Sequence, residues 1–164
     1  MFSFEFVKKN EIEAVAPSLF RILSDNMGAI APTGNTYDKD YQMWSSYVLS
    51  DSFWTSNRQI ILMLAGDEII GYFQYCIVDD TLTAEEIEIA RRFQRTALFG
   101  RFLRFAQTQI PTDVKYIEAY VNKLTANSQR ITSKLGLKII GENKNGKSWR
   151  YRGALKDLAA RMHM

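Results

Sequence analysis

The residues of this sequence that could perform chemistry gather between positions 85 and 106. Glu86 and Glu88 alternate with apolar residues, which is the period of a strand with one buried face. From Leu98 the apolar residues recur at three- and four-residue spacing instead, which is the period of a helix. The junction is basic, because no acidic residue occurs from Ile89 to Thr112. Its cations are Arg91, Arg92 and Arg95.

Such a junction suits a small anion. The first turn of a helix has unpaired backbone N–H groups, and its dipole favours negative charge. Thr96 is the predicted N-cap, and the arginines add charged donors, so this helix start could hold a phosphate or pyrophosphate. The same pattern is typical of an ordinary strand–helix connection with a solvated basic face. The pattern alone leaves both interpretations open.

Composition narrows the class of protein. A chain of 164 residues is expected to form one domain with a sizeable core. Its 46% hydrophobic and 13% aromatic residues exclude a disordered protein. The net charge of +3 is slight and concentrated between residues 91 and 104, which suits a small anionic ligand at least as well as nucleic acid. Nucleic acid is the less expected partner, since no aromatic–basic recognition motif occurs.

Cysteine and histidine are too rare for several kinds of catalytic centre. Cys76 is the only cysteine, so no intrachain disulfide can form, which fits a reducing, cytoplasmic compartment. The one histidine, His163, lies near the chain end, which argues against a Ser-His-Asp triad or a histidine-built metal site. Cys76 is therefore expected to be a buried strand residue, and no metal is expected. The longest apolar run, Ile60–Ala65, is too short to cross a membrane.

The elements that must position these residues follow from the periodicity of the chain. Strands are predicted at residues 2–6, 60–64, 69–78, 85–90, 115–121, 137–142 and 147–152. Helices are predicted at 11–24, 39–48, 97–109 and 125–135, with a short helix or frayed tail at 154–162. Residues 27–37 and 50–57 are interpreted as connections. The expected fold is one α+β domain, residues 1–164, with a mixed, mostly antiparallel sheet of about seven strands flanked by about four helices.

This order of elements resembles the GNAT superfamily of acetyl-CoA-dependent N-acetyltransferases over most of the chain. Two segments carry the resemblance. Gln94-Arg95-Thr96-Ala97-Leu98-Phe99, followed by Gly100, is similar to the family's pyrophosphate loop, Arg/Gln-x-x-Gly-x-Gly/Ala. Residues 127–142 are similar to the family's ending, Asn-x-x-Ala-x-x-x-Tyr-x-Lys-x-Gly-Phe. The sequence departs from the family where Ala97 and Phe99 replace loop glycines and Thr132 replaces the tyrosine that often protonates the departing thiolate.

The resemblance implies that acetyl-CoA is the cosubstrate and that its acetyl group passes directly to a primary amine. Acetyl-CoA would lie in a V-shaped opening between the fourth and fifth strands, with backbone N–H groups near residues 87–89 polarising the thioester carbonyl. Its pyrophosphate would lie on the 94–100 segment. The implied cofactor-binding residues are Ile87, Ile89, Gln94, Arg95, Thr96, Ala97, Leu98, Phe99, Gly100 and Asn127.

The resemblance also implies catalytic roles. An alkylamine with a pKa of about 10 must lose a proton before it attacks, so a base is needed. Glu86 is the first candidate and Glu88 the second, although either could be a solvent-side carboxylate paired with a lysine or arginine. Tyr120 is the best substitute for the missing acid, because the Thr132 hydroxyl is too weakly acidic. A catalytically weak or inactive acyl-CoA-binding relative is the alternative.

The acceptor would be a small-molecule or peptide amine held by the first helices and their loop. The predicted substrate-binding residues are Tyr37, Asp38, Tyr41 and Trp44, whose carboxylate and ring faces could bind a cationic amine. The same residues could equally pack the core or form a homodimer contact.

Overall fold

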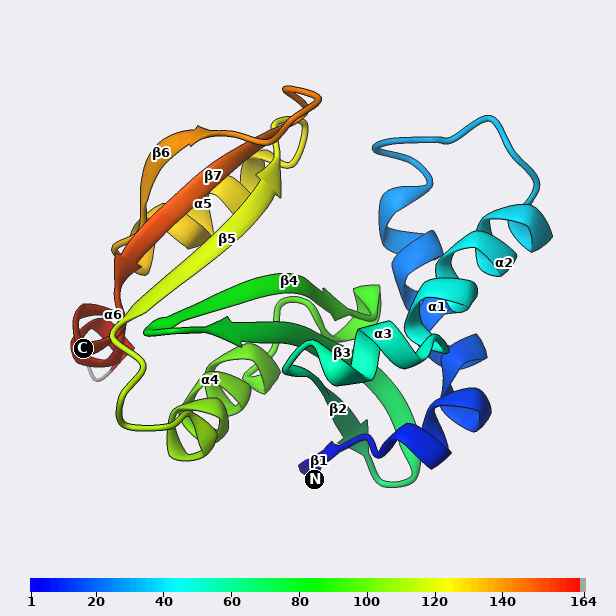
Figure 1. Ribbon diagram of the computed structural model, residues 1–164, viewed down its shortest axis with the longest axis horizontal. Coiled ribbons are helices and arrows are strands. Elements are labelled where there is room, and N and C mark those ends of the chain that lie inside the picture. Colours follow the sequence, from blue (N-terminus) through cyan, green and yellow to red (C-terminus); the bar gives the residue numbers. More distant parts are fainter. Residues whose placement is uncertain (163–164) are drawn as a thin grey trace. The chain divides into compact units, whose positions relative to one another are not determined.

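The computed structural model describes residues 1–162 and contains seven strands and six helices within them (Figure 1). The strands are β1 (Phe2–Phe6), β2 (Arg58–Ala65), β3 (Glu68–Val78), β4 (Thr81–Ile89), β5 (Tyr116–Asn122), β6 (Lys138–Glu142) and β7 (Ser148–Ala154). The helices are α1 (Ile12–Met27), α2 (Tyr37–Val48), α3 (Asp51–Thr55), α4 (Leu98–Gln109), α5 (Ala126–Lys134) and α6 (Leu155–Met162), with two short 3₁₀ turns, η1 (Lys9–Glu11) and η2 (Arg91–Phe93). The histidine invoked above, His163, lies outside the described residues.

The strands follow the order β1-β2-β3-β4-β5-β7-β6. β4 and β5 pair in parallel, whereas β1–β2, β5–β7 and β6–β7 pair antiparallel. The predicted α+β class with a mixed, mostly antiparallel sheet is therefore confirmed. The parallel register joins Thr81–Ala84 of β4 to Tyr116–Ala119 of β5.

Contacts divide the chain into two compact units. Unit 1 comprises Met1–Tyr75 and Glu86–Phe99, and unit 2 comprises Cys76–Glu85 and the chain from Gly100 onward. The boundaries cut through β3, β4 and α4, so the ends of these elements belong to different units.

The core of unit 1 forms where α1, α2 and α3 pack against β2 and β3. Alternate β2 residues Ile60, Leu62 and Leu64 join Tyr72 of β3 in this cluster, together with Val7, Ile12, Leu19, Val48 and Phe53. The intervening β2 residues, Ile61 and Met63, are also buried. Burial on both faces explains why the strand is a continuous apolar run rather than an alternating one.

Unit 2 has a smaller apolar cluster and a buried ion network. Val121, Leu137, Tyr151 and Leu158 form the cluster. Glu118 of β5 is buried, and its carboxylate accepts hydrogen bonds from Arg150 at 2.8 Å and from Arg152 at 2.6 Å. Burial opposes ionisation of Glu118, but the bonds from Arg152 and Arg150 outweigh it and hold the pKa of the carboxyl below its usual range. Cys76 is buried in β3, as expected.

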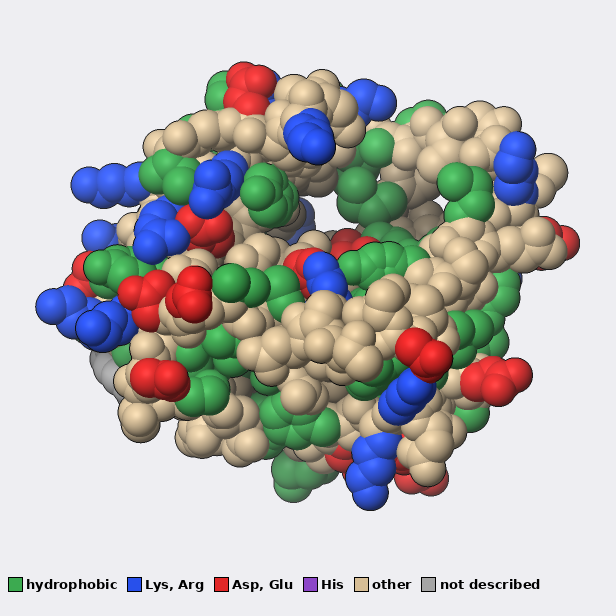
Figure 2. Space-filling model, in the orientation of Figure 1, with side chains coloured by type: hydrophobic (Ala, Val, Ile, Leu, Met, Phe, Trp, Pro, Cys, Tyr) green, Lys and Arg blue, Asp and Glu red, His purple; other side chains and the backbone are tan. Residues whose placement is uncertain are grey.

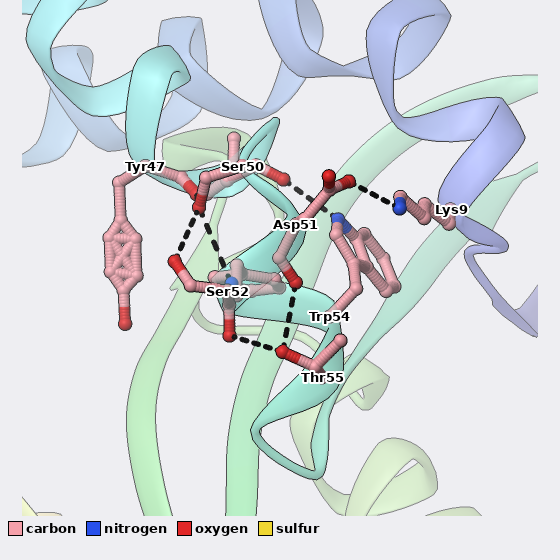
Figure 3. Close-up of polar contacts among 9 residues, drawn as sticks. Lys9, Tyr47, Ser50, Asp51, Ser52, Trp54 and Thr55 are labelled. Atoms are coloured by element: carbon pink, nitrogen blue, oxygen red, sulfur yellow. Dashed lines mark hydrogen bonds and ion pairs between the residues drawn. The ribbon is translucent and has the colours of Figure 1, made fainter.

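Several boundaries differ from the sequence prediction. The 50–57 connection contains α3, because the Ser50 hydroxyl caps it by accepting a bond from the Phe53 N–H at 3.3 Å (Figure 3). The Trp54 indole of this helix donates to the Val48 carbonyl at 2.9 Å, and Lys9 pairs with Asp51 at 2.5 Å. These contacts depend on cap geometry and on partners distant in the sequence, so the spacing of apolar residues could not predict them.

Other elements are longer or additional. α1 continues to Met27 with Pro17 inside it, and α2 begins at Tyr37 behind a Thr36 cap. β4 begins at Thr81, because residues 81–84 pair with β5. The residues after Ala154 form α6, which is the helical alternative for the 154–162 segment. Together with α3, it brings the number of helices in the described part of the chain to six, where about four were expected.

Candidate functional site

The candidate residues of unit 1 meet where β4 ends beside the last turn of α1. The Asn26 side-chain amide of α1 donates to the Glu88 carboxylate at 2.8 Å and to the Ile89 carbonyl at 2.9 Å. Gln94 donates to the Asn26 side-chain oxygen at 3.1 Å and to the same Ile89 carbonyl at 3.0 Å. Three of these bonds attach the end of β4 and the following loop to α1, and the bond from Gln94 to Ile89 ties the loop to β4.

Glu88 is the acid of this cluster, and its surroundings shift its pKa. Burial raises the pKa of its carboxyl from 4.5 to about 7; the Asn26 bond opposes this shift, and the nearby charge of Glu86 adds to it. A carboxyl with this pKa titrates near neutral pH, where its protonated and ionised forms are both populated. Glu88 can therefore act as an acid or a base where an ordinary glutamate stays ionised.

Glu86 has a different partner on the same side of β4. The hydroxyl of Tyr72, a fully buried β3 residue, donates to the Glu86 carboxylate at 2.5 Å. Burial and the Glu86 charge raise the pKa of the Tyr72 phenol well above its usual value. The phenol is therefore a fixed donor that orients Glu86 at neutral pH.

The two carboxylates do not face solvent as the alternating pattern suggests. They point toward the side of the sheet that carries α1, whereas Ile87 is 39% exposed. The expectation of a strand with an apolar buried face is therefore wrong at Ile87. Hydrogen bonds from Asn26 and Tyr72 make burial of the carboxylates tolerable.

The hydroxyl group of Thr96 shapes the loop before α4. Thr96 donates to the Phe93 carbonyl at 2.7 Å and accepts from the Leu98 N–H at 3.3 Å, so it satisfies one N–H of the helix start. Arg95 and Ala97 are exposed, and Phe99 is half-buried. Arg95 forms no ion pair within the described residues. This arrangement leaves a guanidinium available to an anion near the start of α4.

A cavity of about 1210 Å³ opens in unit 1 between the end of α1, the start of α2, the β2–β3 turn and η2. Two of the predicted substrate-binding residues, Tyr37 and Tyr41, line it together with Asn26. Asp38 is exposed and does not line the cavity. Trp44 packs against the core cluster of unit 1. The centre of its ring lies 5.4 Å from the centre of the Phe20 ring.

The remaining predicted residues belong to unit 2. Tyr120 is 44% exposed and lies opposite Arg150 in the β5–β7 register. The side-chain oxygen of Asn127 accepts a bond from Arg130. The hydroxyl of Thr132 donates to the Ser128 carbonyl at 2.7 Å. Gly100 lies in α4, where an added Cβ would meet no atom within 4 Å.

Sequence reasoning missed Asn26 and Tyr72. Asn26 is 62 positions from Glu88, and Tyr72 is an aromatic residue within an apolar strand. Neither position carries a local signal, because each acquires its polar role from a tertiary contact. A polar residue in the last turn of an apolar helix is too common to have identified Asn26.

Three further features of the described part of the chain concern metal sites, membrane-spanning helices and surface charge. No group of three or more His, Cys, Asp and Glu residues able to hold a metal ion occurs among residues 1–162. No helix there is long and apolar enough to span a bilayer. Basic and acidic side chains are interspersed over the face shown in Figure 2.

Comparisons with known proteins place this geometry on a known fold. No protein-family model and no curated protein sequence matches the chain. Solved structures do: PaiA N-acetyltransferase from Thermoplasma acidophilum in complex with coenzyme A is 8% identical, with a TM-score of 0.69 over 94% of this chain and 99% of that one. An acetyltransferase from Thermus thermophilus is 16% identical, with a TM-score of 0.72 over 94% of this chain and 97% of that one.

A third similar structure carries the family name. It is named as an acetyltransferase of the GNAT family, from Desulfovibrio desulfuricans, and is 14% identical with a TM-score of 0.64 over 94% of this chain and 99% of that one. The chain has the GNAT fold. At these identities the likeness concerns the fold alone, so the chemistry of this GNAT-fold chain must be argued from its own residues.

Proposed function

We propose that this chain transfers the acetyl group of acetyl-CoA directly to a primary amine, with Glu88 as the general base. The observation that carries the proposal is the position of the Glu88 carboxylate, which Asn26, a residue of the cavity lining, holds at 2.8 Å. Burial there raises the pKa of this carboxyl to about 7. A general base is most effective when its pKa lies near the working pH. An ordinary glutamate, with a pKa of 4.5, would be a much weaker base.

The proposed reaction needs one proton to be removed and one to be supplied. The amine nitrogen attacks the thioester carbonyl, a C–N bond forms and the C–S bond breaks. The proton lost by the amine passes to Glu88, and the departing coenzyme A thiolate takes up a proton. Tyr120 stays the proposed acid for that last step, on sequence grounds.

The contacts of Glu86 favour a supporting role. Its carboxylate is held by the Tyr72 hydroxyl at 2.5 Å, and its charge contributes to the raised pKa of Glu88. Glu88 instead contacts Asn26, which also lines the large cavity. This connection to a space that could hold the acceptor supports Glu88 ahead of Glu86, the reverse of the sequence-based order.

The proposed contacts with acetyl-CoA are those that the resemblance implies. Backbone groups of residues 87–89 would polarise the thioester carbonyl, and Arg95 with the start of α4 would hold the pyrophosphate. Gln94 already donates to Asn26 and Ile89, which supports a role in shaping the loop. Gly100 and Asn127 stay proposed contacts on sequence grounds, as does the assignment of residues 1–164 to one acyltransferase domain.

The test measures acetyl-CoA binding by calorimetry and then release of free thiol with a panel of primary amines. We expect binding together with amine-dependent thiol release, and we expect Glu88→Gln to keep the binding and lose the release. Binding without thiol release for any amine would favour an inactive acyl-CoA-binding relative, to which Ala97, Phe99 and Thr132 also point. Absence of binding would contradict both proposals.

A further inference from the structure

The cavity of unit 1 carries equal numbers of basic and acidic side chains. Arg21, Arg91 and Arg92 line it together with Asp25, Asp67 and Glu68. Only one ion pair joins these six residues within the described part of the chain, between Arg92 and Glu68. Two arginines and two aspartates thus face the cavity without a charged partner of their own.

The two arginines have contacts that hold them without neutralising them. The Arg21 guanidinium lies 4.2 Å from the centre of the Tyr37 ring, which orients it by a cation–π contact. Arg91 donates to the backbone carbonyl of Asp25. Neither contact supplies a negative charge, so both guanidinium groups can still bind an anion.

A carboxylate is the anion that fits this lining best. Guanidinium groups bind carboxylates and phosphates through paired hydrogen bonds. The unpaired Asp25 and Asp67 on the same cavity penalise a doubly charged phosphate more than a singly charged carboxylate. The same aspartates attract a cation, so the lining as a whole suits a ligand that carries both charges.

We propose that the acceptor is an amino carboxylate, whose carboxylate is bound by Arg21 and Arg91 and whose amine is directed toward Asn26 and Glu88. The inference rests on the proposed acetyl transfer and names its substrate class. Asn26 connects the two ends, because it lines the cavity and donates to Glu88 at 2.8 Å. The rings of Tyr37 and Tyr41 form an apolar wall for the body of the acceptor.

The experiment compares acceptors that differ only in the carboxylate. Thiol release from acetyl-CoA is measured with tyrosine against tyramine, lysine against cadaverine and alanine against ethylamine. We expect kcat/KM to be at least tenfold higher for the amino acid in at least one pair. Equal or lower values in all three pairs overturn the inference, as does a still higher value for phosphoethanolamine, which would make phosphate the preferred anion.

Variants of cavity-lining residues test whether Arg21 is responsible for the preference for a carboxylate. Arg21→Gln should raise KM for the preferred amino acid at least tenfold, leave its kcat within twofold, and change KM for the decarboxylated partner less than twofold. Arg21→Lys should restore part of the loss, because it keeps the charge. Arg104→Gln is the matched control, since Arg104 is exposed on α4 and does not line the cavity. Equal losses for both members of a pair would overturn the inference.

The failures of the two proposals are distinguishable. Loss of acetyl-CoA binding or of all thiol release would contradict the acetyl transfer itself. Turnover of amines with no preference for a carboxylate would leave acetyl transfer intact and overturn only the substrate class. Calorimetric binding of the preferred amino acid in the presence of coenzyme A, weakened by Arg21→Gln, supports the assignment without any reference to turnover.

Discussion

The side-chain amide of Asn26 lies 2.8 Å from the carboxylate of Glu88, although 62 positions separate the two residues in the chain. The bond joins the last turn of α1 to β4 and places a half-buried acid beside the cavity-lining Asn26. Because the amide stabilises the ionised form, it keeps the pKa of Glu88 near 7 against the effect of burial.

Glu88→Gln should abolish the rise of kcat/KM with pH on the acidic side of the pH–rate profile, called the acidic limb below. With a pKa of about 7, Glu88 is largely protonated below neutral pH, so wild-type kcat/KM should rise with pH through about 7. The variant should lose on the order of a hundredfold or more in rate and show no such limb, while acetyl-CoA affinity stays unchanged. Single-turnover rates from pH 5 to 9 test this. Glu86→Gln is the matched control. If only Glu86→Gln loses the acidic limb, Glu86 is the general base, as the sequence alone predicted.

The same pKa predicts how stability depends on pH. Since the folded-state pKa of Glu88 lies above its usual 4.5, the folded chain binds the proton more tightly than the unfolded chain. This stabilisation, about 3 kcal/mol in full, is present below pH 4.5 and is lost as the pH rises through about 7. Urea unfolding of the wild type and Glu88→Gln at pH 5 and pH 8 measures it. The variant should gain stability relative to the wild type at pH 8, and a pH-independent difference would contradict the raised pKa.

Arg95→Glu should weaken acetyl-CoA binding at least tenfold, which is about 1.4 kcal/mol. The exposed Arg95 forms no ion pair in the described part of the chain, so the melting temperature should change little. Calorimetry and thermal unfolding measure the two effects. Arg104→Glu, on the exposed surface of α4, controls for a general loss of positive charge. Unchanged affinity in Arg95→Glu would place the pyrophosphate elsewhere.

Gly100→Ala separates helix stability from ligand contact. An added Cβ would meet no atom within 4 Å, and glycine is about 1 kcal/mol less favourable than alanine within a helix. The melting temperature should therefore rise by about 3 °C. Acetyl-CoA binding should weaken, because the methyl group would occupy space proposed for phosphate oxygens. If calorimetry finds the affinity unchanged, the phosphates do not approach this residue.

Thr132→Ala should change the chemical step by less than about threefold, because an aliphatic hydroxyl is too weak an acid to protonate a thiolate. The hydroxyl proton of Thr132 is, moreover, donated to the Ser128 carbonyl at 2.7 Å. Single-turnover rates with a working acceptor test this, with Tyr120→Phe measured alongside as the proposed acid. A hundredfold loss in Thr132→Ala with acetyl-CoA binding preserved would show that Thr132 takes part in catalysis.

The sequence by itself determined the kinds of element and most of their order. Alternation at residues 2–6 and the three- and four-residue spacing from Leu98 follow from burial of one face, which is a local property of the chain. The glycine after α5 likewise indicated the helix end, and Gly136 has the expected positive φ of 92°. The basic, acid-free start of α4 was visible for the same reason.

Tertiary structure alone decided which residues meet. The partners of Glu86 and Glu88, Tyr72 and Asn26, come from other elements, so no spacing in the sequence could pair them. Burial reversed the expected exposure of Ile87 and Glu88, because hydrogen bonds from distant residues stabilise carboxylates on the covered side of the strand. A pKa depends on desolvation and on neighbouring charges, and both are fixed only when the chain has folded.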